Sequence, residues 1–314
     1  MTAGSLYVDA DVDASSDVSL LAPDATEYKM KVKTRRRHWL RRYGAGLVAG
    51  TVLAVIVLSV MFAHVVTPHD PTAGMRLPYR FMPPMWQAGG TIEHPLGTDN
   101  LGRDILARTL YGGRVSLWVA FTASSIGAVL GIIYGMISGY VGGWVDRLLL
   151  RITDVWVSFP FLVLALAVIA VVGSSPTILI ILMSLSGWVY PARVTRAQTM
   201  KIRQMEYVTA AVALGASSLH IVLRYIVPHV LAVNIVLWTL TFGTLILVES
   251  SLSFIGLGVN PPTPSWGNML SDSKTYLRDA WWMSVVPGVV LMLTILCVNT
   301  VGDALQKYTS RHIR

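Results

Sequence analysis

The residues of this chain that could do chemistry are few and lie far apart in the sequence. Within the apolar stretches the only clear carboxylate is Glu249, while Asp154 and Asp303 lie near the ends of such stretches. The sequence has no Gly-x-x-x-x-Gly-Lys-Ser/Thr phosphate loop, no His-Glu-x-x-His zinc pair and no Gly-x-Ser-x-Gly nucleophile turn. The single cysteine, Cys297, excludes a disulfide within one chain. We therefore expect no catalytic residue, no metal site and no cofactor on this chain.

Glu249 is the one ionisable residue whose position in an apolar stretch suggests a function. An acidic side chain inside a membrane by default faces a cavity or a partner. Two interpretations stay open: Glu249 lines a transport pathway or its wall, or it packs and forms hydrogen bonds near the external end of its helix. A coupled ion transporter usually shows several such residues together with paired broken helices. A single carboxylate is therefore weak support for that class.

Residues 204–229 form a polar, helix-prone segment between two long apolar stretches. Ala210 and Ala211 are small enough to let another protein approach the backbone closely. Gly215 permits a bend between two short helices, and Pro228 suits the first turn of the helix that follows. The segment therefore reads as a docking element, with an amphipathic interfacial connector as the alternative.

The composition requires that these residues be carried by membrane-spanning helices. The chain is 54% hydrophobic and 13% charged, whereas a soluble domain carries about 25% charged residues. The net charge of +8 comes from Lys and Arg residues that flank the apolar stretches. This pattern fits the positive-inside rule better than a nucleic-acid surface, so no nucleic-acid partner is expected.

The expected organisation is a tail followed by six spans. Residues 1–43 form a cytoplasmic tail, with an acidic and disordered part at 1–28 and a basic part at 29–42. Residues 44–314 form the transmembrane domain. An even number of spans places both termini on one side, and most of the 25 Lys and Arg residues then lie in the cytoplasm. The predicted spans are 44–66, 115–141, 150–172, 177–200, 226–255 and 280–303.

The docking segment resembles the cytoplasmic signature loop of ATP-binding-cassette importer permeases. That loop reads Glu-Ala-Ala, three residues, Gly, nine residues, Ile-x-Leu-Pro. The corresponding residues here are Thr209-Ala210-Ala211, Gly215, Tyr225-Ile226-Val227 and Pro228. Thr209 departs from the family's Glu, and Glu206 lies on the same helical face and can supply the missing charge.

Further stretches resemble the C-type permease subunit of bacterial dipeptide and oligopeptide importers, and they follow the family's order over about 35–305. The resemblance implies an all-α polytopic fold with six transmembrane helices of the type I importer permease kind, and coupling helices between spans 4 and 5. It also implies that the chain forms half of a translocation pore. The stretches are 94–104, 111–117, 139–147, 249–258 and 264–267.

The same resemblance implies partners, a location and site residues. The partners are a homologous B-type permease, two ATPase subunits or a fused ATPase, and an extracytoplasmic peptide-binding protein, with ATP and Mg on the ATPases. The location is the bacterial cell membrane, with both termini cytoplasmic. The resemblance also implies that the 205–222 loop couples the chain to the ATPases. The coupling residues implied are Arg203, Glu206, Thr209, Ala210, Ala211, Gly215 and Pro228.

Some alternatives remain open from the sequence. Asp99, Arg103 and Asp104 either cap and orient the helix that leads into the second span or contact the binding protein. The cargo is a peptide, or else a nickel chelate or glutathione as in relatives of the family. An ion-coupled secondary transporter is the alternative from another class. It would work without ATPase partners and would depend on Glu249.

Overall fold

The computed structural model describes residues 44–72 and 75–312, and the acidic and basic parts of the predicted tail lie outside the described residues. Contacts divide the chain into Met1–Ala45 and a second unit, Gly46–Arg314, which holds every side chain discussed below. Among the described residues the regular structure is helical, apart from one isolated bridge between Thr98 and Asp104. The predicted all-α polytopic class is confirmed.

Five helical segments are long and apolar enough to cross a membrane: Gly44–Met61, Ile105–Val141, Pro176–Arg203, Ser218–Phe254 and Trp282–Thr309. The second of them is α3, and the fifth belongs to α12 (Trp282–His312). The third joins α6 (Pro176–Gly187) to α7 (Val189–Arg203). The fourth joins α9 (Ser218–Ile221), a π-helical turn (Val222–Ile226) and α10 (Val227–Phe254).

The segment predicted as a third span, 150–172, is not one straight helix. It contains parts of two helices, α4 (Gly143–Ser158) and α5 (Phe161–Val172), whose axes are bent by 77°. Pro160 lies at the break; it lacks an N–H and disfavours helical backbone at Phe159, which is extended at φ −90° and ψ 124°. The described chain therefore has five candidate spans, or six if the bent pair counts as one.

The helix that contains the second predicted span, 115–141, is longer than that span, because α3 begins at Ile105. The Asp104 carboxylate caps the helix by accepting a hydrogen bond from the Ala107 amide at 2.7 Å. Two arginines in the first turns, Arg108 and Arg114, find partners elsewhere in the fold. With 37 residues α3 is roughly 55 Å long, so it extends beyond a hydrocarbon core of about 30 Å.

A row of glycines at four-residue spacing joins α3 to α6 and α7. A Cβ atom on Gly131, Gly135 or Gly139 would lie 2.5, 2.4 or 2.6 Å from a backbone carbonyl oxygen of Trp188, Ala192 or Arg196, respectively. Glycine repeats of this spacing allow two membrane helices to approach until their backbones touch. Because any side chain would push them apart, α3 and α7 form a tight pair. The row consists of Gly127, Gly131, Gly135 and Gly139.

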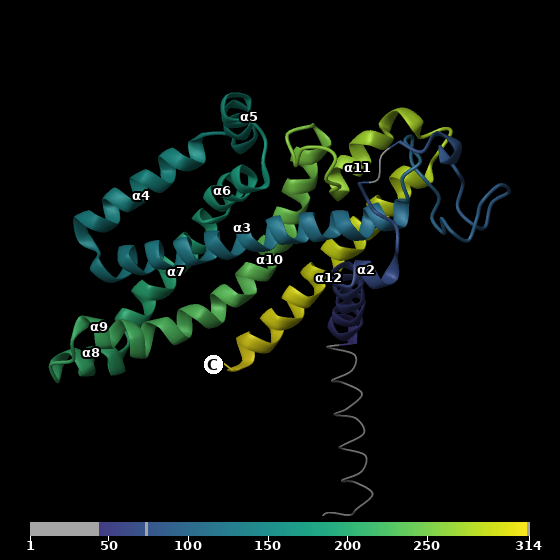
Figure 1. Cartoon of the computed structure of the whole chain (residues 1–314). Helices are drawn as coiled ribbons and strands as arrows, with labels where there is room; N and C mark the ends of the chain where they lie inside the picture. The colour runs from purple at the N-terminus through teal and green to yellow at the C-terminus, as the bar shows by residue number, and fades with distance from the viewer. Residues whose placement is uncertain (1–43, 73–74, 313–314) are drawn as a thin grey trace, which may run out of the picture. The chain divides into compact units, whose positions relative to one another are not determined.

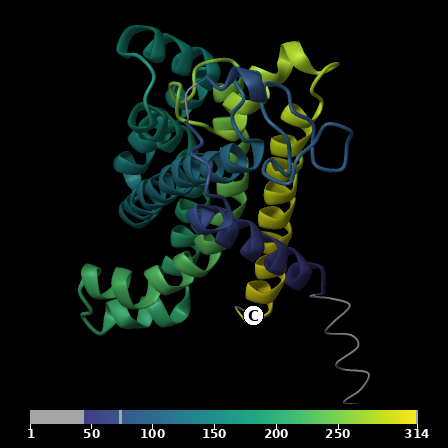
Figure 2. The ribbon, with the colours of Figure 1, turned by 45° about the vertical axis from the view of Figure 1, so that its right-hand side comes forward.

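The helices place two polar regions at opposite ends of this unit. Figures 1 and 2 show α8 (Glu206–Ala213) and α9 at one end, and α11 (Trp266–Ser273) with the 67–104 segment at the other. The C-terminal part of α12 lies toward the α8 and α9 end. A Cβ on Gly46 would lie 2.6 Å from the Ala304 Cβ, so the first helix starts beside the last turns of α12.

Candidate functional site

The segment between α7 and α10 folds into two short helices joined by a glycine turn. Gly215 has φ +86°, in the left-handed region that favours glycine. Its amide donates to the Val212 carbonyl oxygen at 3.0 Å, and the Ala216 amide donates to the Ala211 carbonyl oxygen at 3.0 Å. These two bonds form a Schellman turn that ends α8. Gly215 therefore sets the angle between α8 and α9.

The inner face of this segment is anchored to the rest of the protein. Val208 from α8 and Ile221 from α9 are buried in a cluster with Ile202, Ile226 and Val230. Side chains of α3, including that of Tyr140, pack against the same cluster. Because the cluster joins α3, α7 and α10, a force on α8 and α9 is passed to all three helices.

The outer face of the segment is apolar and exposed. The side chains of Val212, Leu214 and Leu219 are 55%, 88% and 68% exposed. Ala210 and Ala213 are also exposed and add no bulk. Apolar side chains gathered on an exposed, small-residue surface are typical of a protein interface. The segment thus presents a face that another protein can cover.

The charged and polar residues predicted for coupling take different positions. Arg203 donates to the Tyr140 carbonyl oxygen at 2.8 Å, and its guanidinium lies 5.6 Å from the Tyr140 ring centroid. Arg203 thus holds the start of the segment against α3. Glu206 is exposed in the first turn of α8, and the Thr209 hydroxyl donates to the Glu206 carbonyl oxygen at 2.9 Å. Pro228 lies in the first turn of α10, directly after the π-helical turn.

Two polar ties that the sequence did not reveal secure the same end of the protein. Arg196 donates from Nε and Nη2 to the two carboxylate oxygens of Asp146, at 2.5 and 2.6 Å. This two-bond fork joins α7 to α4. Asn234 donates from Nδ2 to the Thr195 hydroxyl at 2.9 Å and so joins α10 to α7. Asp146 and Arg196 are 50 residues apart, so no local motif marks the pair.

At the opposite end, four charged residues form what we call the polar clamp: Asp99, Arg103, Arg108 and Asp272. The Asp99 Oδ2 atom accepts from Arg103 Nε at 2.6 Å and from Arg108 Nη1 at 2.5 Å. Arg108 Nη2 also donates to Asp272 at 3.2 Å, which links α3 to α11. Asp99, Arg103 and Arg108 are at most 9% exposed. In this conformation three of the four clamp residues are therefore buried, and Asp272 is the partly exposed member.

Removing the Asp99 carboxylate should destabilise the protein strongly. We expect Asp99→Ala to lower the free energy of unfolding by about 3 to 5 kcal/mol, because two buried guanidinium groups lose their shared partner. Asp272→Ala is the matched control, because Asp272 is 46% exposed and its loss should cost less than about 1 kcal/mol. Denaturant unfolding in detergent measures both changes. Equal effects of the two substitutions would contradict the assignment.

Asp104 has a second contact besides its cap on α3. Its Oδ2 atom lies 2.9 Å from His94 Nδ1, and the His94 ring lies 4.8 Å from the His69 ring, centroid to centroid. One ligand atom from each of these three residues lies within 4.8 Å of the other two, so the group could hold a metal ion. Beside it, hydrogen bonds from the Thr72 hydroxyl and amide hold the pKa of Asp70 below its ordinary value.

Glu249 lies inside the helix packing and does not line the large cavity described below. Its side chain is fully buried, and its Oε1 and Oε2 atoms accept hydrogen bonds from the hydroxyls of Ser253 at 2.8 Å and Ser250 at 3.3 Å. The hydroxyls of Ser116 on α3 and Ser265 at the start of α11 also interact with the carboxylate. Glu249 therefore joins α10 to α3 and α11.

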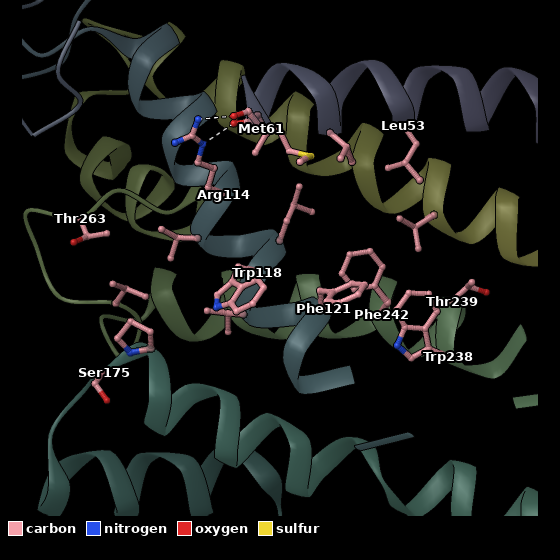
Figure 3. A pocket seen from close by; sticks show the side chains of 18 of the residues that line it. Leu53, Met61, Arg114, Trp118, Phe121, Ser175, Trp238, Thr239, Phe242 and Thr263 are labelled. Atoms are coloured by element: carbon pink, nitrogen blue, oxygen red, sulfur yellow. Dashed lines mark hydrogen bonds between the residues drawn. The ribbon is translucent and has the colours of Figure 1, made fainter. Parts of the chain in front are cut away.

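A cavity of about 1370 Å³ opens between the first helix, α3, α10 and α12 (Figure 3). Its floor is aromatic: the rings of Trp238 and Phe242 stack with their centroids 5.8 Å apart, and the Phe121 ring meets both edge-on. Arg114 lies at its rim, where it donates to the carbonyl oxygens of Val60 at 2.7 Å and Met61 at 2.6 Å. The cavity is thus mainly apolar, and beside it Arg114 joins α3 to the first helix.

Three comparisons relate the chain to known proteins. A family model described as binding-protein-dependent transport system inner membrane component matches residues 131–314. A putative peptide transport system permease protein of Brucella suis is 36% identical, over 94% of this chain and 96% of its own length. The dipeptide transport system permease protein of Escherichia coli is 40% identical, over 86% of this chain and 89% of its own length.

Two further similarities complete the comparison. The glutathione transport system permease protein of Salmonella paratyphi A is 39% identical, over 86% of this chain and 88% of its own length. A solved structure of a methionine ABC transporter in an inward-facing conformation has a TM-score of 0.54. It is 19% identical and covers 65% of this chain and 96% of the other. At this identity the likeness concerns the fold alone.

Proposed function

Because the chain belongs to the family of binding-protein-dependent transport system inner membrane components, we propose that it is one permease subunit of an ATP-driven importer of small peptides. The family makes it a multi-pass membrane protein and the membrane component of a transport system. The observation that carries the proposal further is the exposed apolar face of α8 and α9 around Ala210 and Gly215. Its side chains Val212, Leu214 and Leu219 stay exposed in the described chain.

The proposed cargo is a dipeptide or oligopeptide, since two of the relatives above are named for peptide and dipeptide transport. Glutathione is the second candidate, supported by a relative of nearly the same identity. Glutathione is itself a short peptide, so both cargoes share amide groups and free carboxylates. A nickel chelate is supported only by the resemblance of the sequence to the wider family.

The proposed partners follow from what the chain lacks and what it exposes. It has no phosphate-binding loop of its own, so ATP and Mg are expected on two ATPase subunits or a fused ATPase. A homologous B-type permease supplies the other half of the pore, and the aromatic floor of the large cavity is a surface available to it. An extracytoplasmic peptide-binding protein delivers the cargo.

The proposed orientation places α8 and α9 in the cytoplasm, together with both chain ends. The start of the first helix and the end of α12 lie at the same end of the unit as α8 and α9 (Figures 1 and 2). Lys201, Arg203 and Arg224 also lie at that end. The bias of Lys and Arg toward cytoplasmic loops supports this orientation.

In the proposed mechanism, closure of the ATPases pushes on α8 and α9. The buried cluster around Val208 and Ile221 transmits the push to α3, α7 and α10. The Asn234–Thr195 bond and the glycine row make these three helices move together. At the far end of α10, Glu249 carries the motion to α11 through its serine contacts. The cavity between the first helix and this group then changes its opening.

Replacing Glu249 separates this mechanism from ion-coupled transport. We expect Glu249→Gln to retain at least about half of the uptake, because the serine hydroxyls can rotate to pair with an amide of the same shape. Glu249→Leu should lower the yield of folded protein, because the buried hydroxyls lose their acceptor. Loss of uptake in a stably folded Glu249→Gln variant would favour the ion-coupled alternative.

The proposal as a whole is tested by purifying the chain with its partners from its native membrane and reconstituting the complex in liposomes. We expect a second permease and P-loop ATPases to co-purify, and uptake of radiolabelled dipeptide to require ATP and the binding protein. Competition by unlabelled glutathione, or its absence, separates the two peptide cargoes. A chain that purifies alone and drives uptake with an ion gradient would contradict the proposal.

A further inference from the structure

Three residues from separate parts of the chain between the first helix and α3 converge on one point. His69 follows the first helix and α2 (Ala63–Val66), His94 lies in the following loop, and Asp104 caps α3. One ligand atom from each lies within 4.8 Å of the other two. His94 and Asp104 are buried, and His69 is partly exposed. Neither His69 nor His94 belongs to the polar clamp, to the Glu249 contacts or to the α8–α9 segment.

One ring nitrogen of each histidine and one oxygen of Asp104 can face the same ion. Asp104 Oδ1 accepts from the Ala107 amide, and Asp104 Oδ2 lies 2.9 Å from His94 Nδ1. The Oδ2 and Nδ1 atoms can therefore bind one ion together once Nδ1 has lost its proton. The His69 ring nitrogens have no hydrogen bond within the described part of the chain, where only the backbone amide of His69 donates, to the Thr67 hydroxyl.

The space and the charges at this point suit one small cation. A cavity of about 10 Å³, about the space of one water molecule, is lined by His69, His94 and Asp104 together with Asp70. Arg76 and Arg103 also line it, and the Arg103 guanidinium pairs with Asp99 at 2.6 Å and with Asp272 at 3.8 Å. Ligand atoms around one Zn²⁺ lie about 3.4 Å apart. The partly exposed His69 side chain can close that difference by a small rotation.

We propose that His69, His94 and Asp104 form a Zn²⁺ site that ties the exit of the first helix to the start of α3. Two imidazoles and a carboxylate are ligands that Zn²⁺ accepts, and water completes its coordination. The site stands apart from the proposed transport function and does not depend on the cargo. A bound ion would add a metal-dependent link between these two elements. The link would lie next to the Arg114 hydrogen bonds that already hold the end of the first helix.

The test is Zn²⁺ binding by the purified complex, prepared without a polyhistidine tag and stripped with a chelator. We expect His69→Phe, which keeps an aromatic ring against His94, to bind one Zn²⁺ fewer per chain than the native complex. His69→Cys should restore the ion, because a thiolate is also a zinc ligand. His64→Phe is the matched control: His64 is exposed on α2 and lies outside the cluster.

The readouts are bound zinc by mass spectrometry and the shift in melting temperature on adding Zn²⁺. The native complex and His64→Phe should melt several degrees higher with Zn²⁺, and His69→Phe should not shift. If the native complex and His69→Phe bind the same amount of zinc per chain, the proposal is wrong. Uptake is not needed for either readout, so failure of the transport proposal would leave this test intact.

Discussion

Gly135→Ala is expected to remove most of the folded subunit from the membrane. A Cβ atom at this position would lie 2.4 Å from the Ala192 carbonyl oxygen and 2.7 Å from the Thr195 Cβ. Both atoms belong to α7 and cannot rotate away, so α3 and α7 must separate by about an ångström along their contact. Overpacking of this kind costs about 1 to 3 kcal/mol or more. The loss should appear as a lower melting temperature and less monodisperse protein after detergent extraction.

The matched control is Gly50→Ala, in the first helix. The nearest atom to a Cβ at that position is Val301 Cγ2 at 3.9 Å, which is an ordinary contact. The same chemical change should therefore leave stability unchanged or raise it slightly, because alanine favours helix more than glycine does. If Gly135→Ala and Gly50→Ala behave alike, the tight pairing of α3 with α7 is wrong.

Gly215→Val should abolish transport while the protein still inserts and folds. Gly215 has φ +86°, and no atom lies within 4 Å of a Cβ built there. Space is therefore available, but a β-branched residue is strongly disfavoured in this backbone conformation. The turn should open and α8 should swing relative to α9. The buried inner cluster around Val208 is large enough to keep the segment attached.

The measurement is ATP-dependent peptide uptake beside the melting temperature of the same preparation. Gly215→Asn is the control, because asparagine tolerates the left-handed conformation better than valine does. We expect Gly215→Asn to keep most of the uptake and Gly215→Val to keep almost none, with similar melting temperatures. Normal uptake by Gly215→Val would mean that the angle between α8 and α9 does not matter.

The sequence was sufficient for the class of fold, because apolar runs must lie in lipid whatever their partners. It was less reliable where partners decide the structure. The extent of α3 back to Ile105 is one example, since Arg108 and Arg114 look like loop residues until Asp99, Asp272 and the carbonyls of the first helix pair with them. The bend at Pro160 had a local signal, the proline itself, and could have been predicted.

The candidate site likewise has parts that the sequence could predict and parts that it could not. The exposed α8–α9 segment follows from local residues, so its two helices and the Gly215 turn could be predicted from spacing. The polar clamp could not be, because Asp272 is 164 residues from Arg108. The glycine row at Gly127, Gly131, Gly135 and Gly139 was visible as a four-residue repeat. Its partners on α7 were not, because spacing on one helix does not say which helix packs against it.

The central claim, that α8 and α9 dock on an ATPase, is tested most directly by cross-linking. The chain has one cysteine, Cys297, which is buried, so Cys297→Ser gives a background free of thiols. In that background Ala210→Cys, on the exposed face of α8, should cross-link to a cysteine placed in the groove of the ATPase partner. Ile92→Cys, 84% exposed in the segment that precedes α3, should not. Cross-links from Ile92→Cys, or none from Ala210→Cys in an assembled complex, would contradict the account.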